Sequence, residues 1–329
     1  MNIDITIPGL QRFNWYIDKL KTILEKAYDS EDPALMVYQE NIRTPLFMLE
    51  GLTRVYRKIY GNKIFRKLNN SFKEIEDGLG SIDYYDGFYK EFITKKTIPA
   101  PITDFLMEQK EAHLASLNRV LEDNKWISTN QKRIRKINEK LNDVPWLSEE
   151  QDTIAVKKVY QKCIASLIKK YKNDKLQFNN IEKDLHEFRR ELRWLSIYPQ
   201  AFRGLLQMKT DPQTPEVLKK YLTKEIITSP YNVMPDGSNL KDHIILNADN
   251  FYALSWLIAE LGKLKDNGLR LIIIQEALAK QLNIKQQKVE EQAYSLCGEN
   301  KLMIPDILER AKNITTTFFE ENVLENLVS

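Results

Sequence analysis

The chain has 329 residues, among them 11 glycines and 12 prolines, and its formal net charge is +3 at pH 7. This length allows two domains or one large one, and so few glycines disfavour a turn-rich β fold or a glycine-looped nucleotide-binding sheet. The nearly balanced charge excludes a polycation of the histone kind, so an anion site must come from local segregation of charge. The composition therefore predicts an all-α protein.

Cysteine usage and apolar runs indicate a cytoplasmic protein. Cys163 and Cys297 lie in unrelated helical segments, without the spacing of a disulfide framework or a zinc site. Residues 1–8 lack the basic start and apolar core of a signal peptide, and no run approaches the roughly 18 apolar residues of a membrane span. We therefore expect a cytoplasmic chain that uses no metal and no cofactor and does not enter a membrane.

Apolar spacing predicts helices along most of the chain. Asp32 and Pro33 form a start signal for a second helix that runs to Tyr60, is kinked at Pro45 and ends at Gly61. The other expected helices cover residues 8–28, 63–79, 82–95, 103–125, a segment that Ser128 caps and Pro145 follows, 149–171, 181–195, 248–265, 269–282, 285–296 and 305–327. Residues 224–246, rich in turn signals, are expected to form a long loop.

An apolar stripe and a column of cations share one predicted helix, in the order Leu185-His186-Glu187-Phe188-Arg189-Arg190-Glu191-Leu192-Arg193-Trp194-Leu195. His186, Arg189 and Arg193 stack at i, i+3 and i+7 beside the stripe. Guanidinium groups bind oxyanions with two hydrogen bonds, and an imidazolium adds further donors, so the column suits a run of phosphates. The competing interpretation is a solvated helix face on which Glu187 and Glu191 pair with Arg190.

A second group of cations lies on the predicted helix that ends at Tyr60. Arg43, Arg54 and Arg57 fall in one narrow sector together with Glu50, and Lys58 follows on the same helix. Either Glu50 neutralises part of this sector or the sector binds anions. Basic clusters over 132–140 and 157–170 precede the His186 helix, and adjacent basic helices raise the local potential beyond what either achieves alone.

Catalytic motifs are missing from the sequence, so no enzymatic activity is expected. It has no GxSxG, no P-loop and no dinucleotide-binding glycine pattern, and Asp242-His243 is interpreted as a surface turn. The segment Ile42-Arg43-Thr44-Pro45-Leu46 resembles the phosphoacceptor helix of sensor histidine kinases. Glu40 stands where that motif has its histidine, however, which leaves only a degenerate dimerisation bundle as a minor interpretation.

As a whole the arrangement resembles the CHAD family, helical proteins named for their histidines and associated with inorganic polyphosphate. The stretch 185–193 fits the second-repeat pattern of His, Arg three residues later and a basic residue four after that. Leu79-Gly80 and Asp86 fall where the first repeat has its Leu-Gly and final Asp. The resemblance covers Asp32 to Leu206 by motif and the remainder by length.

Several family positions are changed, namely Tyr38 for the first histidine, Asn41 and Pro45 at the following basic positions, Asp83-Tyr84 for an Arg-Asp pair, and Ser196-Ile197 for a closing Arg-Tyr. The first repeat is therefore degenerate. Arg43, Arg54, Arg57 and Lys58 remain on the same helix and are candidates to substitute for the missing ligands.

The resemblance implies one CHAD-like domain over 1–329, with two related antiparallel helical bundles, 1–145 and 146–329, around a pseudo-twofold axis. It implies non-enzymatic binding of inorganic polyphosphate or a similar polyanion in a basic groove between the bundles, with nucleic acid the less favoured ligand. His186, Arg189 and Arg193 would contact phosphates, while Arg190, Arg54 and Arg57 shape the field. The alternatives are a helical scaffold for a protein partner, its anion site lost, and a polyphosphate-processing enzyme, which the missing carboxylate and metal constellation disfavours.

Overall fold

The computed structural model describes residues 7–61, 63–282, 286–297 and 302–328, and helices form most of it, which confirms the all-α class. The helices are α1 Pro8–Tyr28, α2 Pro33–Gln39, α3 Arg43–Tyr60, α4 Lys63–Phe92, α5 Ala100–Asp123, α6 Lys132–Asn142, α7 Glu149–Lys172, α8 Glu187–Ala201, α9 Lys224–Ile227, α10 Ala248–Leu282, α11 Gln286–Cys297 and α12 Ile304–Glu320. Two short strands, β1 Leu206–Lys209 and β2 Ile244–Asn247, pair in parallel with Leu206 opposite Ile244.

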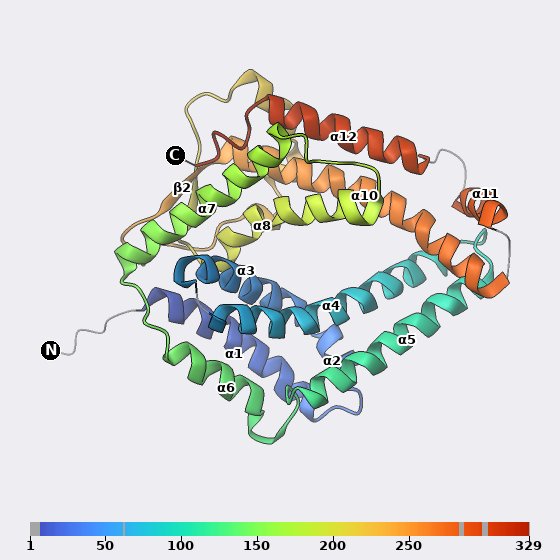
Figure 1. Cartoon of the computed structure of the whole chain (residues 1–329), viewed down its shortest axis with the longest axis horizontal. Helices are drawn as coiled ribbons and strands as arrows, with labels where there is room; N and C mark the ends of the chain where they lie inside the picture. The colour runs from blue at the N-terminus through green and yellow to red at the C-terminus, as the bar shows by residue number, and fades with distance from the viewer. Residues whose placement is uncertain (1–6, 62, 283–285, 298–301, 329) are drawn as a thin grey trace.

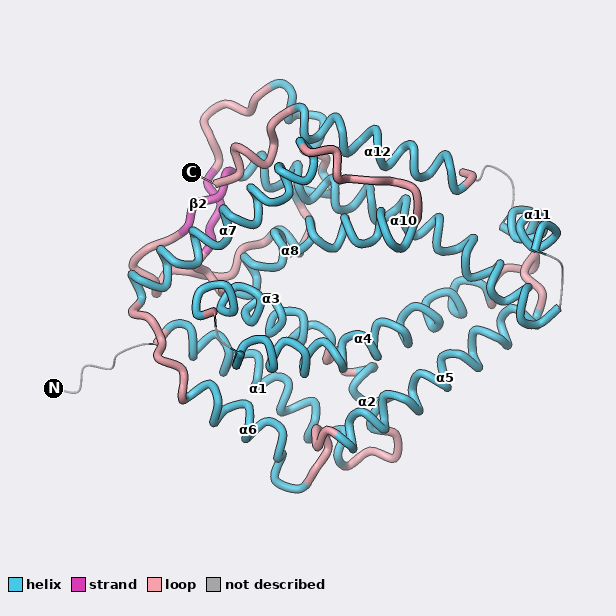
Figure 2. The backbone as a smooth tube through the Cα atoms, viewed as in Figure 1, coloured by secondary structure: helices cyan, strands magenta, loops and turns pink. Residues whose placement is uncertain are grey.

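The helices form two layers with a space between them. Figure 1 shows α1 to α6 in the lower layer and α7, α8, α10 and α12 in the upper one. The layers meet at two places, because α3 packs on α7 and α8 while the far part of α10 packs on α5. The backbone trace in Figure 2 shows the same ring of helices, with the two strands beside the C-terminus.

A buried polar network joins the two layers where α1, α3 and α7 meet. Arg12 donates to the Tyr56 hydroxyl at 2.8 Å and to Asp152, and Tyr56 donates to the other oxygen of Asp152 at 2.9 Å. Arg12 is 5% exposed and Asp152 1%. A charge buried this deeply is tolerated only with a hydrogen-bonded partner, so this network fixes α7 against the first two long helices.

Local end signals of the sequence appear where they were predicted. The Asp32 side chain accepts a hydrogen bond from the Leu35 amide at 3.1 Å and caps α2. Gly61 closes α3 with a left-handed φ of 61°. A capping box of Ser148 and Gln151 at the start of α7 was not predicted.

The predicted kink at Pro45 is wrong, and so is the predicted break near residue 80. The helix expected from Asp32 to Tyr60 is interrupted at Asn41, whose φ is 54°, and Pro45 lies in the first turn of α3, where its missing N–H costs nothing. Gly78 and Gly80 lie inside the continuous α4. A Cβ atom at either position would come within 3.2 Å of a neighbouring side chain, so these glycines allow close packing instead of ending a helix.

The second half of the chain holds three further corrections. One helix of 35 residues, α10, replaces the two predicted over 248–265 and 269–282, because Gly268 provides room for Ile181 and does not end the helix. The expected loop over 224–246 contains α9 and the start of β2, so it is shorter and more ordered than predicted. The helix expected over 305–327 ends earlier, since α12 stops at Glu320. Residues 1–6 and Lys285, on which parts of the sequence analysis fell, lie outside the described residues.

No described helix combines the length and the apolar character that crossing a membrane requires.

Candidate functional site

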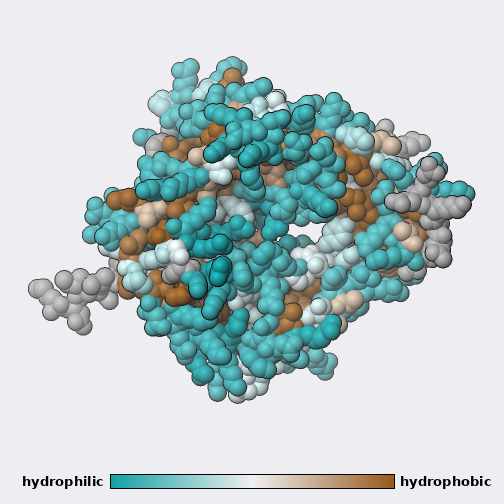
Figure 3. Space-filling model, in the orientation of Figure 1, coloured by the Kyte–Doolittle hydropathy of each residue, from teal (hydrophilic) through white to brown (hydrophobic). Residues whose placement is uncertain are grey.

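A cleft with a volume of about 1020 Å³ lies between the two layers. Its walls come from α4 and the N-terminal part of α3 on one side, and from α8 and α10 on the other. The space-filling view in Figure 3 shows an opening at this position in the middle of the face. A smaller cavity of about 600 Å³ between α1 and residues 126–135 contains none of the predicted site residues.

A π-helical turn, Ile181–His186, carries the chain into α8 and was not predicted. The Asn180 side chain caps the turn by accepting hydrogen bonds from the amides of Glu182 and Lys183, each at 2.9 Å. Such wide turns are frequent at functional sites because the extra residue changes the direction of the side chains that follow. His186, Arg189, Arg190 and Arg193 all line the cleft.

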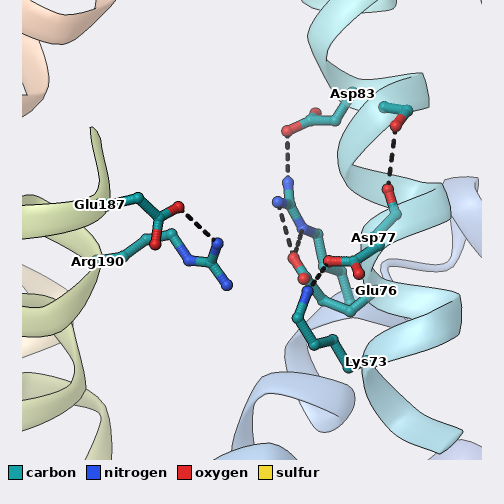
Figure 4. Close-up of polar contacts among 8 residues, drawn as sticks. Lys73, Glu76, Asp77, Asp83, Glu187 and Arg190 are labelled. Carbon is teal, nitrogen blue, oxygen red and sulfur yellow. Dashed lines mark hydrogen bonds and ion pairs between the residues drawn. The ribbon is translucent and has the colours of Figure 1, made fainter. Parts of the chain in front are cut away.

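Two of these four cations are paired with carboxylates of their own helical segment. The Nδ1 atom of His186 lies 3.0 Å from Glu182 Oε2, and the hydrogen bond from His186 lowers the pKa of Glu182. Arg190 donates from Nη1 to Glu187 Oε1 at 3.0 Å, as Figure 4 shows. Both pairs are partly exposed, so each costs little to open when a stronger ligand arrives.

On the opposite wall, the cation of α3 is also paired. Arg43 donates from Nε to Glu76 at 2.9 Å and from Nη1 to Asp83 at 2.7 Å. Figure 4 shows Glu76, Asp77 and Asp83 on α4, across the cleft from Arg190. Both carboxylates that bind Arg43 therefore share one guanidinium from their own layer.

Arg189 has no carboxylate of the described residues within ion-pair distance. Its Nε donates to the carbonyl oxygen of Ile258, at 2.9 Å, in the middle of α10. A Cβ atom on Gly262 would lie 3.0 Å from the same Nε, so glycine at 262 leaves the space in which this guanidinium lies. Burial lowers the pKa of Arg189, and Asp266 opposes that change.

Arg193 is held by an aromatic ring and not by an acid. Its guanidinium lies 4.5 Å from the centroid of Phe47, and Arg43 lies over the same ring at 5.2 Å. This guanidinium makes no hydrogen bond or ion pair with any residue that the structure describes. Burial and the neighbouring Arg189 and Arg43 lower the pKa of Arg193 to about 10, which still leaves it charged at neutral pH.

Three of the predicted ligands lie outside the cleft. Arg54 stacks on Trp194 at 4.3 Å, and its Nε is buried without a hydrogen-bond partner among the described residues. Arg57 is exposed elsewhere on α3, and Lys58 contacts the Cys163 sulfur at 3.2 Å. The structure thus brings Arg43 together with His186, Arg189, Arg190 and Arg193, because only the first turns of α3 reach the cleft.

The sequence analysis missed the acidic and aromatic wall of α4. Glu76 and Asp83 are separated by two helical turns, which places them on one face of a continuous helix. The predicted break near residue 80 had assigned them to different helices and concealed this signal. Tyr84 and Phe88 continue the same wall, with their rings 5.3 Å apart in an edge-to-face contact.

Within the described part of the chain, no cluster of three histidine, cysteine, aspartate or glutamate side chains is placed to hold a metal ion. Comparisons with known proteins found no protein-family model, no curated protein and no solved structure that matches the chain significantly. The resemblance to the CHAD family, the division into repeats 1–145 and 146–329 and the pseudo-twofold axis therefore stay predictions that depend on the motif residues.

Proposed function

We propose that the cleft binds a phosphate-bearing anion and catalyses no reaction. Inorganic polyphosphate or a similar polyanion is the ligand that the family resemblance implies. One observation carries the proposal: Arg189 and Arg193, one turn apart on α8 and half-buried, lack a carboxylate partner among the described residues. Two such guanidiniums repel each other, and an anion between them would relieve that repulsion.

The acids of the cleft support this proposal because each is already paired with a cation. Glu76 and Asp83 share Arg43, Glu182 pairs with His186, Glu91 pairs with Arg270 at 2.7 Å, and Asp266 pairs with Lys265 at 2.7 Å. Asp77 contacts Lys73. The positive charge of the cleft that has no carboxylate partner is therefore concentrated at Arg189 and Arg193, whose guanidiniums can form charge-assisted hydrogen bonds to phosphate oxygens.

A second candidate function, a scaffold for a protein partner, has its own observation. His186, Arg190 and Arg43 each contact a carboxylate of the chain, so these three predicted ligands are already occupied. A scaffold that has lost its anion site would show such internal pairing. In that case wild-type protein binds no inorganic phosphate compound, and its protein partner stays bound when polyphosphate is added.

The experiment is a calorimetric titration of tripolyphosphate into wild type and Arg193→Met at about 50 mM and about 200 mM salt. We expect the substitution to weaken binding about tenfold or more, since hydrogen bonds to charged groups contribute about 1.5–3 kcal/mol. Wild-type affinity should also fall at the higher salt concentration, because the interaction is electrostatic.

The matched control is Arg66→Met, which removes one exposed arginine from α4 outside the cleft. It should bind tripolyphosphate like wild type. Equal, salt-insensitive binding by wild type and Arg193→Met would remove the cleft from the proposal, and no binding by wild type would favour the scaffold.

A further inference from the structure

Unpaired charge in the cleft is matched to a single phosphate group. Among the described lysine and arginine side chains that line the cleft, only those of Arg189 and Arg193 have no carboxylate partner. A phosphate monoester carries about 1.5 to 2 negative charges near neutral pH, which two guanidiniums balance. A second and third phosphate of a longer chain would have to displace Glu182, Glu187 or Glu76 from its cation.

The walls beyond these two arginines include apolar and aromatic side chains, which lie beside the ion pair of Glu91 and Arg270. Tyr84 and Phe88 of α4 line the cleft on one side, and Leu269 and Ile272 of α10 line it on the other. Phe88 is 9% exposed and Leu269 4%, whereas Tyr84 and Ile272 are partly accessible. An inorganic phosphate chain gains nothing from such walls, while a flat apolar group between them would be removed from water.

The charged and the apolar parts of the cleft are contiguous. Arg189 lies against α10 at Gly262, and Leu269 follows seven residues later, which is about 10 Å along the helix axis. Burial raises the pKa of Tyr84, and the nearby carboxylate of Glu182, the partner of His186, raises it further. A single ligand that consists of a phosphate, a sugar and a base can therefore contact both the charged and the apolar part of the cleft.

We propose that the preferred ligand of the cleft is a phosphate monoester with an aromatic body, of the size of a nucleoside monophosphate. This inference depends on the anion-binding function proposed above and adds the class of ligand. The phosphate contacts Arg189 and Arg193, and the ring system lies between α4 and α10. The volume of about 1020 Å³ accommodates such a molecule.

The test compares three probes by calorimetry: adenosine monophosphate, ribose 5-phosphate and inorganic pyrophosphate. The first two carry the same phosphate group and differ in the base. We expect adenosine monophosphate to bind about tenfold more tightly than ribose 5-phosphate, because stacking of a base on aromatic side chains contributes about 1–3 kcal/mol. Arg193→Met should weaken binding of both.

A substitution in the apolar part separates recognition of the base from recognition of the phosphate. Ile272→Ser should weaken the binding of adenosine monophosphate about fivefold and leave the affinity for ribose 5-phosphate unchanged, since only the base contacts this side chain. The matched control is Ile154→Ser on α7, where the isoleucine is 62% exposed and lies outside the cleft. Its affinities for both probes should equal those of wild type.

The possible results distinguish the two proposals. If ribose 5-phosphate binds as tightly as adenosine monophosphate, or if Ile272→Ser changes neither affinity, the proposal of an aromatic ligand is wrong, while the proposal of an anion site is unaffected. The same conclusion follows if pyrophosphate binds through Arg193 and adenosine monophosphate does not bind. If none of the three probes binds wild type, the anion-binding function itself is contradicted.

Discussion

At the scale of single residues, burial decides which charges in and beside the cleft remain available. Arg193 is half-buried among other guanidiniums and keeps its charge, whereas Glu50, directly behind the cleft wall, is 1% exposed. One oxygen of Glu50 has no hydrogen-bond partner among the described residues. Burial, followed by the neighbouring Glu76, raises the pKa of Glu50 to about 7. The sequence left open whether Glu50 neutralises part of the arginine sector or the sector binds anions, and the burial of Glu50 could not be predicted from helical spacing alone.

Glu50 should make folding stability depend on pH. The folded protein keeps the proton up to about pH 7, whereas the unfolded chain releases it near the ordinary value of 4.5. The folded state thus binds more protons between these values, so the contribution of Glu50 to stability falls as the pH rises from about 4.5 to about 7. Glu50→Gln should remove this fall and exceed wild type in free energy of unfolding by about 3 kcal/mol at pH 8.

Urea unfolding of both proteins at pH 5 and pH 8 measures this effect. Glu108→Gln, which changes an exposed glutamate of α5, should reproduce the pH dependence of wild type. The account of Glu50 is wrong if Glu50→Gln is no more stable than wild type at pH 8.

At the scale of elements, the glycines show which helix ends can be predicted from the sequence and which cannot. Local signals succeeded at Asp32 and Gly61, because a cap and a left-handed residue act within one turn of their own helix. Gly80 and Gly268 were mistaken for helix ends. Glycine at these two positions leaves space for Arg43 and Ile181, side chains from distant segments that no local pattern identifies.

Gly262 packs against Arg189, so a substitution there tests whether such a glycine positions a side chain of the cleft. Gly262→Ala should not lower the free energy of unfolding, since alanine favours a helix over glycine by about 1 kcal/mol. The new Cβ would lie 3.0 Å from Arg189 Nε and displace the guanidinium, so affinity for tripolyphosphate should fall several-fold. Calorimetric titration and urea unfolding of the same preparation measure both quantities.

A control for stability is Gly87→Ala, because a Cβ atom at Gly87 of α4 meets nothing within 4 Å. This substitution should raise the free energy of unfolding by about 1 kcal/mol, the helix preference of alanine over glycine. Unchanged affinity in Gly262→Ala would show that the position of Arg189 does not depend on this glycine.

At the scale of the whole molecule, the cleft lies between two places where the described helices of the two layers pack on each other, α3 on α7 and α8, and α10 on α5. Arg12 and Asp152 fix one end, and Arg270 of α10 bridges to Glu91 of α4 at 2.7 Å on the other side. His186 and the three cleft arginines of α8 could be predicted as one group because they follow each other along one predicted helix. Their acidic counterparts on α4 could not, since their distance from α8 is set by tertiary packing of segments about 100 residues apart in the sequence.

The most direct measurement is a crystal structure of the protein soaked with tungstate, whose anomalous scattering locates a phosphate-sized dianion. We predict a peak within hydrogen-bond distance of the guanidiniums of Arg189 and Arg193, with Arg193 still stacked on Phe47. Crystals of Arg193→Met should lack that peak. Tungstate found only at exposed lysines such as Lys158 and Lys162, with nothing beside Arg193, would contradict the account.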